Sequence, residues 1–125
     1  VEYVKKGPAK NFAIIDAAMN DLMRPSLYNA HHDIINTSKC TAESTTFDVV
    51  GPVCETGDFI GKDRNLSLAE GNLLAVVDVG AYGMSMSSNY NSRVRPVELL
   101  VDGDKIREIR KRENFSDLIR GESII

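Results

Sequence analysis

Two cysteines and the lack of any long apolar run are the first features of this 125-residue sequence. Cys40 and Cys54 are too few for a disulfide-dense scaffold, although a single bridge between them stays open. Together with the adjacent His31 and His32 they do not present the four-ligand spacing of a zinc site. No apolar stretch approaches the ~20 residues of a membrane helix, and the first residues lack the apolar region of a signal peptide. These absences predict a cytoplasmic chain with reduced thiols and no membrane partner.

A strong excess of one charge is also missing. Lys and Arg total 15 against 18 Asp and Glu, for a net charge of −3 and a pI near 5.3, which argues against nucleic acid as a partner. Hydrophobic residues make up 42% of the chain, so disorder is not expected. A chain of this length buries roughly two-thirds of its unfolded surface. We therefore expect one soluble domain over residues 1–125, and the start at Val1 rather than Met indicates a piece of a longer protein or a processed one.

Short apolar runs bounded by Gly, Pro or Asn predict a mainly β fold. In chain order these runs cover residues 1–6, 12–16, 47–53, 58–61, 73–79 and 94–101. The first two flank a turn that contains Gly7 and Pro8, which favours a hairpin. Pro96 interrupts the last run and places that strand at a sheet edge or a bulge.

The last 25 residues predict one more strand and one helix. An Asp-Gly turn at 102–103 favours a strand over 105–112, although two isoleucines three residues apart in that stretch also suit a helix. Asn114 is a good helix cap, Asp117 follows three residues later, and Gly121 ends the turn. The whole pattern predicts an antiparallel sandwich or Greek-key barrel with a short C-terminal helix.

Residues 19–28, MNDLMRPSLY, are the first segment that favours a ligand site. Pro25 restrains the backbone of Arg24, so a planar guanidinium with five donors is held close to the end of a strand. Arg24 and Tyr28 are four residues apart, so on one helical turn they share a face and can bind one carboxylate. The alternative, which spacing alone favours, is an Arg24–Asp21 ion pair with Tyr28 in the core.

A thiol followed directly by a carboxylate marks the second segment, GPVCETGD at 51–58. A thiol such as that of Cys54 is a plausible proton donor at neutral pH, and a carboxylate such as that of Glu55 can bind a substrate ammonium group. Residue types alone favour the alternative, in which Cys54 is a buried apolar residue and Glu55 is solvated.

The third segment, GAYGMSMSSNYN at 80–91, places Tyr82 between Gly80 and Gly83. The glycines allow a ligand to approach the backbone closely, and a phenol there can stack on or hydrogen-bond to a planar group. Taken alone, the segment is also compatible with a simple turn.

Read in order, MNDLMRPSLY, GPVCETGD and DVGAYGMSMSSNYNSRVRP resemble the C-terminal half of the diaminopimelate decarboxylase family. The resemblance runs from about Glu2 to Ile119. It implies a β-rich C-terminal domain of an enzyme that uses pyridoxal 5′-phosphate (PLP) to make L-lysine from meso-diaminopimelate. In that family a PLP-binding (β/α)₈ barrel precedes the domain, and the active sites are shared between the subunits of a homodimer. The barrel, with its cofactor-binding lysine, has no counterpart here, so the chain alone is expected to be inactive.

The resemblance also implies roles for five side chains. Arg24 and Tyr28 would bind the distal carboxylate of the substrate, and Glu55 its distal amino group. Cys54 would face the reacting carbon as the proton donor, and Tyr82 would contact both cofactor and substrate. No metal is implied.

Two other functions stay open at this point. One is a decarboxylase for ornithine, arginine or carboxynorspermidine, which would need an acidic pocket for a distal cation in place of Arg24 and Tyr28. The other is a free-standing β module that binds a ligand or partner without catalysis, with Arg24 engaged only in a salt bridge.

Overall fold

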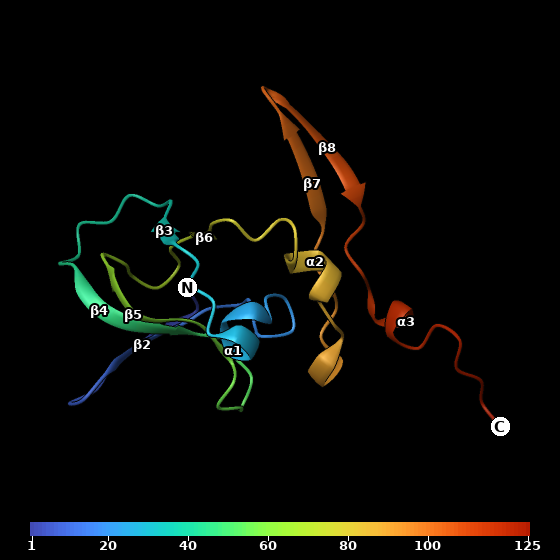
Figure 1. Ribbon diagram of the computed structural model, residues 1–125, viewed down its shortest axis with the longest axis horizontal. Helices are drawn as coiled ribbons and strands as arrows, with labels where there is room; N and C mark the ends of the chain where they lie inside the picture. Colours follow the sequence, from blue (N-terminus) through green and yellow to red (C-terminus); the bar gives the residue numbers. More distant parts are fainter.

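Three sheets and a few short helical turns make up the computed structural model, which describes all 125 residues (Figure 1). The elements are β1 (Tyr3–Lys6), β2 (Asn11–Ile14), α1 (Arg24–Tyr28), β3 (Ile34–Asn36), β4 (Thr45–Val50), β5 (Phe59–Leu66), β6 (Leu74–Val76), α2 (Gly83–Met86), the 3₁₀ turn η1 (Tyr90–Ser92), β7 (Glu98–Asp102), β8 (Lys105–Arg110) and α3 (Phe115–Leu118). The sheets have the strand orders β1-β2-β4-β5, β3-β6 and β7-β8. The expected mainly β fold is therefore confirmed. No helix combines the length and the apolar character needed to cross a membrane.

The hydrophobic core lies against the four-stranded sheet and is built by alternation along its strands. In β4, Phe47 and Val49 are buried on the same face, two residues apart, as the period of a strand requires. Residues from β2, β3, β5 and the connecting segments also belong to the cluster, whose nine members are Ala13, Ile15, Leu22, Ile34, Phe47, Val49, Ile60, Leu66 and Leu68.

One parallel pairing sets the direction in which two loops leave the sheet. β1 and β2 form the expected antiparallel hairpin and β5 pairs antiparallel with β4, but β2 and β4 run parallel, with Ile14 opposite Val50. The pairing continues beyond the strand ends, where the Ile15 amide donates to the Val50 carbonyl at 2.9 Å. The carboxyl ends of both strands therefore meet at one edge of the sheet, and the segments after Ile15 and after Val50 emerge side by side.

The parallel pair requires a long crossover connection, and that connection carries α1 and β3. Pro25 in the first turn of α1 presets a helical backbone angle and is buried, so it also anchors the helix. Asn29 ends α1 in the left-handed region at φ 52°. The sequence gives a clear helix signal only near the C-terminus, so α1 and α2 are additions to the expected fold, as is β3.

The C-terminal elements follow the sequence pattern closely. A turn with Gly103 at φ 61° joins β7 to β8, and α3 has a capping box between Asn114 and Asp117. The strand expected over 94–101 begins only at Glu98, beyond Pro96, and a bulge lies between Glu98 and Leu99. In Figure 1 this hairpin projects away from the other two sheets.

Candidate functional site

Arg24 lies in contact with two tyrosine rings. Its guanidinium carbon is 4.8 Å from the centroid of the Tyr82 ring and 5.9 Å from that of Tyr28, both within the range of a cation–π contact. Arg24 forms no ion pair, and its Nε is buried without a hydrogen-bond partner. A buried donor of this kind is costly unless a ligand satisfies it.

Both parts of the alternative for this segment are wrong. Asp21 does not pair with Arg24, because its carboxylate accepts a hydrogen bond from the Ala18 amide at 2.9 Å and lies 3.6 Å from the Arg93 guanidinium. Tyr28 is 62% exposed and does not belong to the core. The side chains of Arg24 and Tyr28 therefore remain available to a ligand.

The turn at 51–58 is fixed against α1 by one buried carboxylate and one glycine. Asp58, only 3% exposed, accepts hydrogen bonds from the Met19 amide at 2.7 Å and the Val53 amide at 2.6 Å. At Gly57 a Cβ atom would come within 2.8 Å of the Ser26 Oγ, so glycine allows the turn to approach the helix. The second segment is thus held next to the first.

Cys54 and Glu55 point to solvent from this turn. Cys54 is exposed and Cys40 half-buried, and both are free thiols, so the alternative in which Cys54 is buried is wrong. Residue types favour burial of cysteine, but here the tight turn carries the thiol outward. Glu55 is not simply solvated either, because its Oε1 accepts a hydrogen bond from the Tyr90 hydroxyl. That hydrogen bond, with the negative charge of the carboxylate, raises the pKa of Tyr90.

Asn20 joins the third segment to the first. It is 1% exposed, and its carbonyl oxygen accepts a hydrogen bond from the Ser88 amide at 3.0 Å while its Nδ2 donates to the Ser88 carbonyl at 3.2 Å. Its Oδ1 accepts from the Arg93 Nε at 2.8 Å. The segment that carries Tyr82 and Tyr90 is therefore anchored at the edge of the sheet from which Arg24 emerges.

The five expected site residues form two groups on adjacent segments. Arg24 and Tyr28 meet Tyr82, and Cys54 and Glu55 lie on the turn that contacts Tyr90. No hydrogen bond or ion pair joins the two groups directly. They are connected through the buried side chains of Asp58 and Asn20 described above.

Sequence patterns did not reveal Asn20, Asp58 or Tyr90. All three lie inside or beside the segments quoted above, but each acts through a partner far along the chain, 39 residues away for Asp58 and Met19 and 35 for Tyr90 and Glu55. An Asn or Asp in a turn normally bonds its own backbone nearby. The only available signal is the density of polar residues beside Pro and Gly in these segments.

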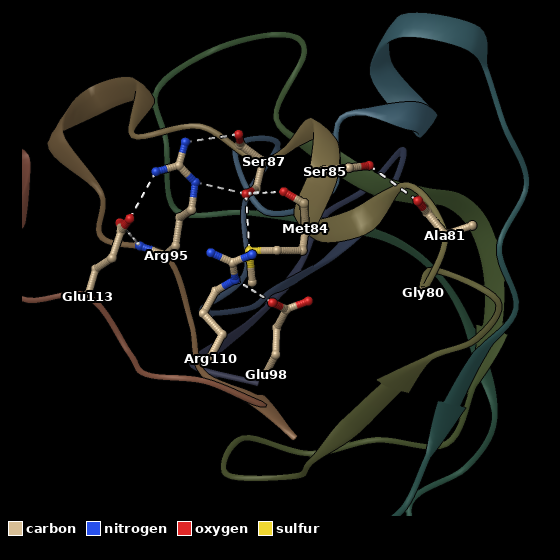
Figure 2. Close-up of a pocket in the computed structure, with 9 residues that line it drawn as sticks. All are labelled: Gly80, Ala81, Met84, Ser85, Ser87, Arg95, Glu98, Arg110 and Glu113. Atoms are coloured by element: carbon tan, nitrogen blue, oxygen red, sulfur yellow. Dashed lines mark hydrogen bonds and ion pairs between the residues drawn. The ribbon is translucent and has the colours of Figure 1, made fainter. Parts of the chain in front are cut away.

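A cavity of about 430 Å³ is lined in part by the third segment, and Figure 2 shows its lining residues, among them Gly80, Met84 and Ser87. Its charged side chains satisfy one another, since Arg95 pairs with Glu113 at 2.9 Å and Arg110 pairs with Glu98. Backbone and side-chain hydrogen bonds from Arg95, together with one from Asn89, hold the pKa of Glu113 below its usual range. The hydrogen bonds of Arg95 to Ser87 hold the third segment beside this cavity, and none of the five expected site residues lines it. No three His, Cys, Asp or Glu side chains are grouped so as to hold a metal ion.

Comparison with known proteins assigns the family. Residues 1–80 match the family described as "Pyridoxal-dependent decarboxylase, C-terminal sheet domain". The chain is 55% identical over 125 residues to a diaminopimelate decarboxylase from Pseudomonas aeruginosa and 58% identical to one from Vibrio cholerae. Each alignment covers all of this chain and 30% of the relative, so the chain spans less than a third of these curated relatives.

Solved structures agree with the sequence comparison. Diaminopimelate decarboxylase from M. jannaschii, in complex with L-lysine, superposes with a TM-score of 0.93 at 42% identity, over 100% of this chain and 29% of that one. The Helicobacter pylori enzyme, also complexed with L-lysine, gives 0.88 at 51% identity over 96% of this chain and 29% of that one. A lysine/ornithine decarboxylase from Vibrio vulnificus, at 18% identity and a TM-score of 0.66, shares the fold. The family match over 1–80 and these superpositions show that the chain belongs to the C-terminal sheet domains of the pyridoxal-dependent decarboxylases.

Proposed function

We propose that this chain is the C-terminal domain of a diaminopimelate decarboxylase and supplies part of the site in which meso-diaminopimelate loses CO₂ to give L-lysine. The relatives that carry this name support the proposal. The observation that carries it is the position of the Arg24 guanidinium, which lies against the rings of two exposed tyrosines, Tyr28 and Tyr82. Its Nε is buried and has no hydrogen-bond partner. No carboxylate of this chain pairs with the guanidinium, which leaves it free to bind an anion, and a second carboxylate is what distinguishes diaminopimelate from ornithine, arginine and lysine.

Arg24 and Tyr28 bind the distal carboxylate in this proposal. The guanidinium offers a planar pair of N–H donors and the phenol a third donor, and the ring contacts limit the directions that Arg24 can take. A substrate without this carboxylate leaves the donors unpaired, which rejects it far more strongly than a missing methylene would. Binding energy at the distal end thereby orients the reacting end.

In this proposal Glu55 and Cys54 act at opposite ends of the substrate. The exposed Glu55 carboxylate binds the distal ammonium group, so the distal head group is held at both its charges. Cys54 is the adjacent residue, and its exposed thiol is free to donate a proton to the reacting carbon after CO₂ has left. Both residues leave the turn toward a surface that this chain does not cover.

Tyr82 is the residue of this chain that would touch the cofactor. It is 54% exposed, and Gly80, two residues before it, has no atom within 4 Å of where a Cβ would lie. When bound, PLP supplies the electron-withdrawing ring that makes loss of CO₂ feasible. In this proposal the covalent attachment of PLP and its phosphate site lie in a barrel domain of the full-length protein.

The proposal extends to assembly and compartment. Active sites that need this domain and a barrel fit a homodimer in which Cys54 and Glu55 reach the site of the neighbouring subunit. We place the enzyme in the cytoplasm, where two free thiols such as Cys40 and Cys54 persist.

The test is decarboxylation by the full-length protein loaded with PLP. We expect CO₂ and L-lysine from meso-diaminopimelate, and turnover of ornithine, arginine, lysine and carboxynorspermidine at least 10⁴-fold lower in kcat/KM, since unpaired buried donors discriminate at about that level. Preference for any of these basic compounds would contradict the proposal. A reading frame that begins at Val1, instead of continuing upstream by a barrel of about 250 residues, would favour a non-catalytic module.

A further inference from the structure

Glu55 occupies an exposed turn in which little else fixes its side chain. Its amide donates to the Val53 carbonyl at 2.8 Å, which shapes the turn but leaves the carboxylate free to sample several rotamers. The Tyr90 hydroxyl is the one side chain that bonds to that carboxylate. The orientation of Glu55 therefore depends on the position of Tyr90.

Tyr90 itself is held rigidly from several directions. Its amide donates to the Ser88 Oγ at 3.3 Å, and Ser88 is bonded through its backbone to the buried Asn20. The neighbouring residues are held as well, because the Arg95 guanidinium donates to the Asn89 Oδ1 at 2.6 Å and to Ser87. Figure 2 shows the bonds to Ser87. The phenol is thus presented by a segment whose three residues before Tyr90 are hydrogen-bonded to Asn20 and Arg95.

The backbone after Tyr90 takes an unusual path. Asn91 and Ser92 are consecutive residues in the left-handed region, at φ 59° and 56°. Such conformations are uncommon outside glycine, and they persist where the surrounding contacts determine the backbone. They complete η1 directly after Tyr90, whose hydroxyl bonds to Glu55 on the 51–58 turn, 35 residues earlier in the chain.

We propose that Tyr90 is a positioning residue that holds one oxygen of Glu55, so that the other oxygen is directed at the distal ammonium group of the substrate. This inference rests on the proposed function, in which Glu55 binds that group. A carboxylate has two oxygens with about four acceptor sites, so it can accept from the phenol and from an ammonium at once. A tyrosine hydroxyl ionises only near pH 10, and the pKa of Tyr90 is raised further by Glu55, so the phenol is a donor throughout the neutral range. Tyr90 never touches the substrate in this arrangement.

The test is Tyr90→Phe in the full-length, PLP-loaded enzyme, with two inhibitors as probes. L-lysine, bound as the product with its ε-amino group at the reacting end, keeps both distal charges, whereas 2-aminopimelate keeps the distal carboxylate and lacks the distal amino group. In the variant we expect KM for meso-diaminopimelate and Ki for L-lysine to rise roughly tenfold, as expected for one hydrogen bond to a charged group. The Ki for 2-aminopimelate and kcat should change by less than about twofold. Tyr3→Phe, on the exposed strand β1, is the matched control and should change nothing.

Three results would overturn the inference. An equal rise in Ki for both inhibitors would show that the substitution disturbs the whole site. An unchanged Ki for both would show that the Tyr90–Glu55 hydrogen bond does not contribute to binding. A further defect on adding Tyr90→Phe to Glu55→Gln would show that Tyr90 acts independently of Glu55. If Tyr90→Phe does not fold, Ser88→Ala, which removes the hydroxyl bonded to the Tyr90 amide, replaces it. This variant must raise Ki for L-lysine and leave Ki for 2-aminopimelate unchanged. Absence of wild-type activity on meso-diaminopimelate would instead refute the proposed function.

Discussion

Arg24 combines a fixed position with an unsatisfied donor. The rings of Tyr28 and Tyr82 lie beside its guanidinium, and its buried Nε has no acceptor in this chain. The planar fork cannot be replaced by the point charge of lysine, which has neither the same stacking nor a bidentate geometry. Charge alone is therefore not enough at this position.

Arg24→Lys should weaken substrate capture more than turnover. We expect KM for meso-diaminopimelate to rise about 30-fold or more, because one partner of a charged bidentate hydrogen bond is lost, with kcat within about fivefold. Steady-state kinetics of the full-length enzyme measures both. Arg107→Lys, on the exposed strand β8, serves as the control, and an unchanged KM for Arg24→Lys would remove Arg24 from the carboxylate site.

Cys54→Ala should have the opposite effect. Loss of a general acid costs about 10²–10⁴-fold in rate, so kcat should fall by that factor while KM stays within a few-fold. Cys40→Ala, at the other free thiol, should retain wild-type kinetics. Equal turnover in the wild type and Cys54→Ala would exclude the thiol as proton donor.

The residue types of the site could be predicted from sequence, but their supports could not. Arg24, Tyr28, Cys54, Glu55 and Tyr82 lie in local patterns, and the family resemblance supplies the roles that remain to be tested. Hydrogen bonds such as those of Asp58 and Asn20 join segments 39 and 68 residues apart. No local periodicity encodes a contact at that separation, so these supports become visible only in the folded chain.

At the level of secondary structure, strand existence was easier to predict than strand pairing. The apolar runs behind β2 and β4 are evident in the sequence, and the hairpin β1–β2 follows from its turn. The parallel pairing of β2 with β4 does not, because a crossover from 15 to 44 contains no strand signal of comparable strength. The short strand β3 and the five-residue helix α1 gain stability from packing rather than from propensity.

Gly51→Ala tests the junction between the first two segments. A Cβ at Gly51 would lie 2.4 Å from both carboxylate oxygens of Asp58, so that buried carboxylate must move away from the Met19 and Val53 amides. Leaving buried groups unpaired costs about 2–4 kcal/mol. Urea unfolding measures the loss, and Gly80→Ala, where a Cβ meets open space, should cost less than about 0.5 kcal/mol. Equal stability of the two variants would contradict this role of Asp58.

Glu113 makes the stability of the third segment dependent on pH. Its carboxylate accepts from the Arg95 amide, the Asn89 side chain and the Arg95 guanidinium, which lower its pKa. A folded pKa below the unfolded one gives stabilisation that is complete above about pH 4.3, the ordinary glutamate value, and is lost as pH falls through the folded pKa. Glu113→Gln should therefore be less stable than the wild type at pH 7, and the difference in unfolding free energy should shrink below pH 4. A difference that stays constant down to pH 3 would contradict this.

For the whole molecule, the uncovered hairpin is the dominant surface feature. On β7 and β8, five large apolar side chains are 47–67% exposed: Leu99, Leu100, Val101, Ile106 and Ile109. Val101 and Ile106 are directly paired across the hairpin, so they share one face. The hairpin stands apart from the other sheets (Figure 1), and no other part of the chain covers it.

The 125-residue chain by itself should self-associate through this hairpin. Exposed apolar surface of this kind favours association in water, so sedimentation velocity should show a weight-average mass that rises with concentration above 13.8 kDa. Val101→Glu with Ile106→Lys should reduce the association and leave the far-ultraviolet circular dichroism unchanged. A monomeric wild-type chain at 100 μM would contradict the prediction.

The parallel pairing of β2 with β4 has a practical consequence for protein engineering. Because both strands end at the same edge of the sheet, the exposed α1 positions Leu27 and Tyr28 can be randomised while Pro25, which is buried, is kept. A library of variants at these positions would select for ligands with other head groups and leave the hydrophobic core unchanged.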